Sequence, residues 1–290
     1  MHNIYELTED NISAYRDYVG ADVAENLGRT YYHGLIVCDD SAGPVAGIVW
    51  EFRKLDSEED SESVIEWIRV EDETAFEEMM EAYNMQMADK EIRRSKVVIP
   101  TKDGKILNSL LKKVGFDMKL SESNLTVVRL SELSGSPFMK KLEGRKIPDS
   151  IKALKSINPR TFRAGIAKCV VRGRKGLCED LGDLYINWFE DDVSCASLDE
   201  KGINGFFLFH KKPSGLITVQ LMICLDSDFK IILPRMMHRF VKAMEEKYGP
   251  DQKVAFDRHN EQTMLLAERL IPRGFGTPVY SGSREENNGR

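Results

Sequence analysis

Four polar residues stand where their side chains could handle an amine or a phosphate. Glu66 interrupts an apolar run in the first half of the chain, and a carboxylate beside apolar walls can have its pKa raised until it accepts a proton from an amine. Lys230 and Arg235 follow an apolar run in the second half, where their cations could bind phosphate oxygens. His259 follows a shorter run, at a strand end where sites often form. These residues predict proton transfer and phosphate binding.

Each of these residues also has a simpler structural interpretation. Glu66 could face solvent from one side of a strand, and Gln220, which lies at the matching place in the second half, cannot accept a proton. Asp226 and Asp228 compete for the two cations, and a loop histidine without a fixed partner is not a base. The histidines show no spacing with cysteines or carboxylates that is typical of zinc, so we expect no metal site.

Length and composition predict a soluble protein of two domains. The chain has 290 residues, of which 42% are hydrophobic and 30% are charged. Its longest nearly uncharged run, 215–225, is about half the ~20 residues of a membrane span, and its polar start does not resemble a signal peptide. Five cysteines lack a C-x-x-C pair, which favours reduced thiols and a cytoplasmic location.

The two halves of the chain carry opposite net charges. Residues 1–140 contain 16 Lys+Arg and 27 Asp+Glu, a net charge of −11, whereas residues 141–290 contain 25 and 20, a net charge of +5. A phosphorylated ligand is therefore expected on the second half. Attraction between the two halves explains the asymmetry equally well.

Apolar patterning in the first half predicts an alternating series of strands and helices. Two β-branched runs flank a turn at 39–44 and form a hairpin, and a third strand covers 64–70. The helix that follows has apolar residues at helical spacing, at Phe76, Met79, Met80, Tyr83 and Met87. A short strand over 96–100 precedes a second helix, which Gly115 ends in a left-handed conformation. A strand over 125–130 closes this half.

The second half repeats this order. Strands over 193–198 and 205–210 form a hairpin, and a third strand covers 216–225. The next helix carries one apolar stripe, made of Phe229, Ile232, Leu233, Met236, Met237, Phe240, Val241 and Met244. A strand over 253–256 and a helix that ends at Gly274 complete the copy. From the short strand to the Gly-Phe pair the copies span 20 and 22 residues, so they are in register.

This repeated order resembles the fold of the GCN5-related N-acetyltransferases, the GNAT family, over about 4–133 and 147–281. The resemblance implies an α/β fold (α+β mixed sheet) with two tandem acyl-CoA N-acyltransferase-like domains. It also implies transfer of an acyl group from acetyl-CoA to an amine. The family often places an asparagine at the start of its last helix to support the cofactor, a role that falls to Asn260. Asn260 could equally be an ordinary helix cap.

Both copies depart from the family's glycine-rich pyrophosphate loop. The first copy has carboxylates there, Glu71, Asp72 and Glu73, which complement the helix dipole and repel phosphate. The second copy offers only its two cations, and Pro234 is expected in the first turn of the helix. Ala267 stands where the family keeps a tyrosine as general acid. These departures leave open a binding or regulatory module that has lost acetyl-CoA chemistry.

We accordingly expect three regions, an acidic and non-catalytic GNAT-like domain over 1–135, a second GNAT-like domain over 136–282 and a disordered tail over 283–290. The expected activity is acetyl transfer from acetyl-CoA to an unidentified amine, with Glu66 as candidate base. The expected contacts with the cofactor are Lys230, Arg235, His259 and Asn260.

A basic segment over 160–175 offers a third interpretation, a surface for RNA. It contains six cations and no acidic residue, but only Phe162 could stack on a base. Binding of nucleic acid is therefore not favoured.

Overall fold

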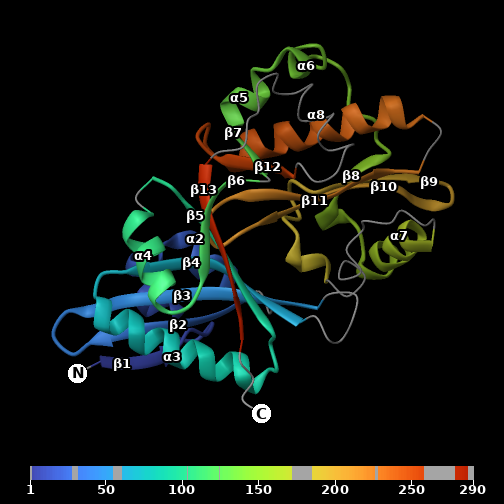
Figure 1. Cartoon of the computed structure of the whole chain (residues 1–290). Coiled ribbons are helices and arrows are strands. Elements are labelled where there is room, and N and C mark those ends of the chain that lie inside the picture. Colours follow the sequence, from blue (N-terminus) through green and yellow to red (C-terminus); the bar gives the residue numbers. More distant parts are fainter. Residues whose placement is uncertain are drawn as a thin grey trace. The chain divides into compact units, whose positions relative to one another are not determined.

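The computed structural model consists of two compact units (Figure 1). It describes residues 2–27, 32–54, 61–102, 104–123, 125–171, 185–225, 228–257 and 278–286. Unit 1 comprises Met1–Ser123, Lys212–Ser214 and Pro278–Arg290, and unit 2 comprises Asn124–Lys211 and Gly215–Thr277. Each unit has its own sheet and its own buried core. The predicted α/β class with two tandem domains is confirmed.

Unit 1 is built on a mixed sheet of seven strands. Their order across the sheet is β1 (His2–Glu6), β2 (Tyr32–Asp39), β3 (Gly43–Lys54), β4 (Ser61–Val70), β5 (Arg94–Pro100), β13 (Pro278–Glu285) and β6 (Asp117–Glu122). All neighbours are antiparallel except β4 and β5, which are parallel. The parallel pair needs a crossover, and helix α3 (Glu73–Asp89) provides it.

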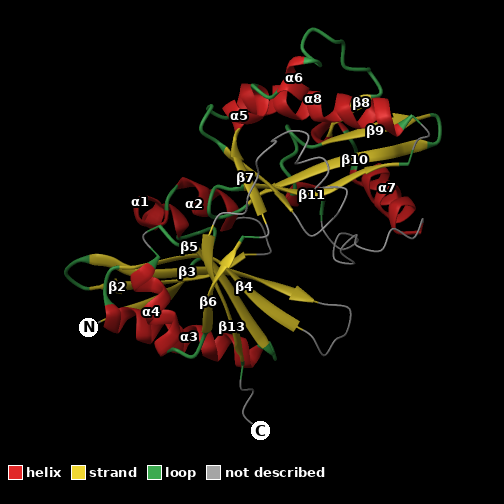
Figure 2. Ribbon diagram, turned by 45° about the horizontal axis from the view of Figure 1, so that its top comes forward, coloured by secondary structure: helices red, strands yellow, loops and turns green. Residues whose placement is uncertain are grey.

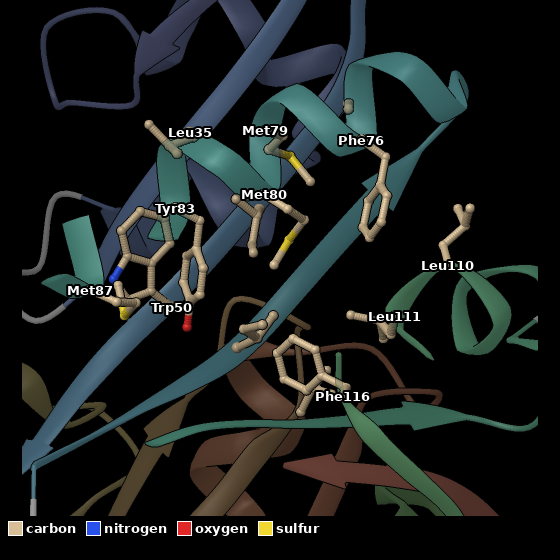
Figure 3. Packing of buried hydrophobic residues seen from close by; sticks show 14 of the residues in the cluster. Leu35, Trp50, Phe76, Met79, Met80, Tyr83, Met87, Leu110, Leu111 and Phe116 are labelled. Carbon is tan, nitrogen blue, oxygen red and sulfur yellow. The ribbon is translucent and has the colours of Figure 1, made fainter. Parts of the chain in front are cut away.

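Helices cover both faces of this sheet. The apolar stripe predicted for α3 is buried, and it packs with α4 (Lys105–Lys113) on one face (Figure 3). On the other face Ile36 and Val49 pack against η1 (Ile12–Tyr15), α1 (Arg16–Val19) and α2 (Ala21–Leu27). Successive residues of a strand point to opposite faces, which is why β2 and β3 are apolar on both. Gly115 ends α4 with φ +92°, as predicted.

Unit 2 is built on a mixed sheet of six strands. Their order is β7 (Leu125–Arg129), β12 (Lys253–Asp257), β11 (Ile217–Cys224), β10 (Gly202–Lys211), β9 (Cys195–Asp199) and β8 (Ile151–Ala153). Its helical segments are α5 (Leu130–Ser134), α6 (Pro137–Lys140), η2 (Leu154–Ser156), α7 (Pro159–Val171), η4 (Ile186–Trp188) and α8 (Phe229–Lys247). Helices α7 and α8 lie on opposite faces of the sheet (Figure 2). Phe206 contacts Phe162 of α7, whereas Phe209 stacks on Phe240 of α8 at 3.7 Å between ring centroids.

Each sheet is completed by a strand that the sequence places in the other half. We predicted that 125–130 closes the first copy, but β7 pairs with β12 of unit 2. The chain's last strand, β13, lies instead between β5 and β6 of unit 1, where Ser281 pairs with both Val98 and Lys119. The predicted boundary at 135 is therefore displaced to Ser123, and the second domain does not extend to 282. The predicted tail over 283–290 is also corrected, because Ser283–Glu285 form part of β13.

Two further sequence predictions concern the environment of the chain. Within the described ranges, no helix is both long enough and apolar enough to cross a membrane. None of the described cysteines, Cys38, Cys169, Cys195 and Cys224, forms a disulfide bond. Burial raises the pKa of Cys195 to about 12, so this thiol is a core residue rather than a nucleophile.

Candidate functional site

In both units the parallel strand pair separates part-way along its length. In unit 1, β4 and β5 pair from Glu62 to Ile65, and the pairing then stops. In unit 2, β11 pairs with β12 only at Ile217 and Thr218. Beyond these points the facing edges have no ladder partner within the described parts of the sheets. Backbone amides at such edges need other partners, and an extended ligand can supply them.

A β-bulge accompanies the separation in each unit. Ile65 and Trp67 of β4 pair with the consecutive residues Trp50 and Val49 of β3, so β3 has no residue opposite Glu66. In the same way, Val219 and Leu221 of β11 pair with consecutive residues of β10, so β10 has no residue opposite Gln220. A bulge bends its strand and increases the twist, and so directs it away from the parallel neighbour. Glu66 and Gln220 are therefore equivalent positions, as their places in the sequence predicted.

The two bulge residues have different surroundings. Glu66 Oε1 accepts a hydrogen bond from Lys212 Nζ at 2.6 Å, and both residues belong to unit 1. The side chains are 7% and 19% exposed, so this ion pair is largely removed from water. Gln220 donates to Thr218 Oγ1 at 2.6 Å. The bulge of unit 2 thus carries a neutral amide where unit 1 carries a paired carboxylate.

Helix α3 of unit 1 begins among carboxylates that already have partners. Asp72 accepts a hydrogen bond from the Ala75 N–H at 2.7 Å and caps the helix. Glu71 pairs with Arg69 at 2.6 Å, and Glu73 pairs with a lysine of α4. An anion placed there would meet three negative charges and would have to displace the Asp72 cap. This helix start is unsuited to phosphate.

Helix α8 of unit 2 begins differently. Its N-cap residue, Asp228, makes no side-chain capping hydrogen bond, and its first turn contains no acidic residue. Lys230 is exposed, and Arg235 is half-buried with an Nη1 atom that is buried without a hydrogen-bond partner among the described residues. Pro234 is the sixth residue of the helix, so its predicted place in the first turn was wrong. The positive end of the helix dipole, two cations and the absence of a first-turn acid make this start suitable for an anion.

No family model matches the sequence, and no curated protein matches it. Over its whole length the chain is similar to a tandem GNAT protein from the clavulanic acid biosynthesis pathway, with a TM-score of 0.60, 9% identity and 99% of that chain covered. It is also similar, over 98% of its length, to a GCN5-related glucosamine N-acetyltransferase region in a fungal multi-domain GH3 β-N-acetylglucosaminidase. There the TM-score is 0.52, the identity is 12% and 38% of that chain is covered.

The chain has a tandem GNAT-like fold. The two GNAT-like units correspond to the two copies predicted from the repeat. At 9% identity the likeness concerns the fold, so the chemistry must be argued from the residues of this chain.

The GNAT-like fold brings together only part of the predicted site. Lys230 and Arg235 lie on the same helix of unit 2, beside the separated strands. Glu66 belongs to unit 1, so it does not share a unit with them. His259 and Asn260 lie outside the described residues. The ion pair of Glu66 could not have been found from the sequence, because its partner lies 146 residues away.

The other predicted surfaces have structural partners. In the basic segment, the Arg163 guanidinium lies 5.4 Å from the centroid of the Tyr185 ring, and Lys168 donates to the Ile203 carbonyl at 3.0 Å. Arg160 is exposed at the start of α7, and the last three cations, Arg172, Arg174 and Lys175, lie outside the described residues. No group of His, Cys, Asp and Glu that could hold a metal ion occurs in the described part of the chain.

Proposed function

We propose that this protein is an acyl-CoA-dependent N-acyltransferase and that unit 2 binds the acyl-CoA. The observation that supports this most directly is that unit 2 combines an open strand edge with a cationic helix. The open edge of β11 runs to the start of α8, whose first turn carries Lys230 and no acidic residue and whose second turn carries Arg235. A ligand with an extended amide arm and a phosphorylated end matches both features, and acyl-CoA has both parts.

The phosphate end would lie at the start of α8. First-turn N–H groups and the positive end of the helix dipole favour an anion, and the two cations add charge-assisted hydrogen bonds. Arg235 Nη1 is buried and lacks a hydrogen-bond partner among the described residues, which a phosphate oxygen would supply. Phe229 and Ile231 are 44% and 62% exposed on either side of Lys230. Their apolar surface suits the nucleoside part of the same ligand.

The amide arm would pair with the open edge of β11. Val219 and residues 221–224 pair with β10 on one side and have no ladder partner on the side of β12 within the described strands. The pantetheine arm of CoA contains two amides, which can donate to and accept from such an edge as an added strand would. This placement directs the thioester toward the bulge at Gln220.

The reaction joins the amine nitrogen to the thioester carbonyl carbon and breaks the carbon–sulfur bond, which releases CoA as the thiol. Backbone N–H groups of the open edge can donate to the carbonyl oxygen as negative charge develops on it. Gln220 cannot accept the proton of the amine, so unit 2 contributes orientation and electrostatic stabilisation at this position. Unit 1, with its carboxylate-lined helix start, has the supporting role. We propose acetyl as the acyl group and a small molecule or a protein as the amine acceptor.

Calorimetric titration of the full chain with CoA and with acetyl-CoA tests the cofactor site. The double variant Lys230→Ala/Arg235→Ala should bind about 10- to 100-fold more weakly, because two charge-assisted contacts with phosphate are lost. The matched control is Lys141→Ala/Lys253→Ala, which removes two exposed cations elsewhere in unit 2 and should leave the affinity unchanged. Equal affinity of the wild type and the first double variant would refute this placement.

Release of CoA thiol across a panel of amines separates the enzyme from a module that only binds. Transfer to at least one amine, with loss of the rate in the same double variant, is the expected result. Binding of acetyl-CoA without transfer to any amine would support the binding or regulatory module instead. Absence of binding would remove both.

A further inference from the structure

A cavity in unit 2 lies away from the separated strands. Helices α5 and α6 lie on the side of α8 opposite the sheet (Figures 1 and 2), and a cavity of about 610 Å³ lies among them. It is lined by Leu130, Ser131, Ser134, Gly135, Met139, Lys140, Glu143, His238, Val241, Lys242, Glu245, Tyr248 and Pro250. No residue of β11 or β12 and none of the first nine residues of α8 contributes to it. It is therefore separate from the proposed acyl-CoA site, and its volume is typical of a small-molecule site.

A buried imidazole in this cavity lacks a partner. His238 is 3% exposed, and its Nδ1 atom is buried without a hydrogen-bond partner among the described residues. Burial, together with the nearby cations Lys242 and Arg235, lowers the pKa of His238, so the ring is neutral at pH 7. Buried polar atoms in proteins almost always have a partner, and His238 Nδ1 beside this cavity is free to accept or donate a hydrogen bond to a molecule within it.

The charged residues around the cavity are balanced and unpaired. Lys140 and Lys242 supply two cations, and Glu143 and Glu245 supply two carboxylates. Among the described residues, none of these four forms an ion pair within 4.0 Å. All four are exposed, so a ligand can reach them without disturbing the fold. Opposite charges held apart around one opening are complementary to a molecule that carries both signs.

The inner wall of the cavity is apolar. Leu130, Met139 and Val241 are between 1% and 5% exposed, and they separate the charged rim from the core of unit 2. The hydroxyl groups of Ser131 and Ser134 provide further polar contacts beside them. Ligand sites commonly combine such an apolar wall with a few directed polar groups.

We propose that this cavity binds a small zwitterion with an apolar part, of the class of free α-amino acids. The carboxylate of the ligand contacts Lys242 and hydrogen-bonds His238, its amine contacts Glu245 and Glu143, and its side chain lies against the apolar wall. The site is distinct from the acyl-CoA site and does not depend on the proposed activity.

Titration of the full chain with the twenty amino acids at millimolar concentration, followed by thermal unfolding and calorimetry, tests the site. We expect at least one amino acid to raise Tm and to bind with measurable heat, whereas acetate and methylamine, each with one charge, do not. Failure of the whole panel to bind would overturn the proposal. Binding of acetate as tight as that of the best amino acid would overturn the zwitterion assignment.

Substitutions on the exposed rim locate the binding without loss of fold. Lys242→Gln and Glu245→Gln should each weaken binding about tenfold, which corresponds to the loss of one charge-assisted contact. The matched controls Lys253→Gln and Glu246→Gln make the same charge changes at exposed positions outside the cavity and should leave affinity unchanged. Equal affinity in all four variants would overturn the site. Displacement of the amino acid by saturating CoA would also overturn it, because the two sites are separate.

Discussion

Helices α3 and α8 occupy the same place in their units and have similar buried faces. Met79, Met80, Tyr83 and Met87 of α3 have the same spacing as Met236, Met237, Phe240 and Met244 of α8, and all eight are buried. The two helices differ in how their central aromatic residue contacts the sheet. The Tyr83 hydroxyl lies 2.8 Å from both Ser63 and Ser95 and ties α3 to β4 and β5, whereas Phe240 stacks on Phe209. Burial raises the pKa of Tyr83 to about 12, so it is a structural hydroxyl.

The two helices differ more strongly in the surfaces that do not face the core. Helix α3 begins with a satisfied acidic cap, and Glu81, one residue after its Met79–Met80 pair, is exposed. Helix α8 begins without a capping side chain, and His238, one residue after Met236–Met237, is buried under α5 and α6. One backbone plan therefore supports a helix start with a satisfied acidic cap in unit 1 and a helix start without a capping side chain in unit 2. The four predictions below test that contrast.

The largest effect is expected from removal of β13. Ending the chain after Thr277 deletes the strand between β5 and β6 and leaves both with unpaired inner edges. Unit 1 should lose its cooperative fold, because no other strand joins β6 to the sheet. Hydrogen exchange should show fast exchange in β5 and β6 and continued protection in β9 and β10.

The matched truncation ends the chain after Glu286 and keeps the whole of β13. It should exchange as the wild type does. Protection of β5 and β6 in the shorter chain would contradict the assignment of β13 to unit 1. It would indicate that β7 had taken the vacant place, and β12 would then lose protection.

A smaller effect is expected when the bulge of unit 1 is made to resemble that of unit 2. Glu66→Gln removes the carboxylate and leaves Lys212 largely buried without its counter-charge. Breaking such a pair should lower the free energy of unfolding by about 1 to 3 kcal/mol, measured by denaturant titration. The double variant Glu66→Gln/Lys212→Met should recover part of this loss, because it removes the unpaired cation.

The same variant separates two roles of Glu66. The pairing with Lys212 favours a structural role, so the rate of acyl transfer should change little in Glu66→Gln. A loss of about 100-fold or more, with a changed pH profile, would instead establish Glu66 as the general base predicted from the sequence.

The next smaller effect is expected from substitutions of the residues that begin helices α3 and α8. Asp72→Ala removes the hydrogen bond to the Ala75 N–H and should destabilise unit 1 by about 1 kcal/mol. Asp228→Ala removes no capping bond to α8, so it should lower the free energy of unfolding by less than Asp72→Ala does. Chemical denaturation of both variants checks this difference. Equal losses would mean that the two helix starts do not differ as described.

The local sequence pattern predicted much of this fold. Most of the features that it missed depend on pairing between strands that are far apart in the sequence. The apolar stripes and Gly115 identified α3, α4 and α8, since side chains on one helix face share one environment. Strands β1 and β6 were missed because they are mostly exposed and polar. The exchange of β7 and β13 could not be predicted, because the local pattern of a strand does not specify which distant strands it pairs with.

The site was predictable to a similar extent. Matching the two copies placed Glu66 and Gln220 at equivalent positions, and the bulges confirm it. The ion pair with Lys212 and the burial of His238 had no local signal. His238 occupies an outward position on its helix, and only the packing of α5 and α6 over α8 makes it a buried residue.

The smallest effect is expected from His238, which has no buried counterpart on α3. Its pKa is lowered in the folded protein, so below the ordinary value of about 6.5 the unfolded chain takes up a proton that the folded chain resists. Stability is therefore complete above this pH and decreases as the pH falls toward the folded pKa. Lys242 and Arg235 strengthen this effect and Glu245 opposes it.

His238→Leu removes this titration and keeps a side chain of similar size. The Tm of the variant relative to wild type should be constant above pH 7 and should rise by about 2 °C or less between pH 6.5 and 5. Lys140, the last residue of α6, and Glu143, three residues after it, also line this cavity and are the same in both proteins. A Tm difference that does not change with pH would mean that His238 is charged or solvated in the folded protein. The outer face of α8 would then be as open as that of α3.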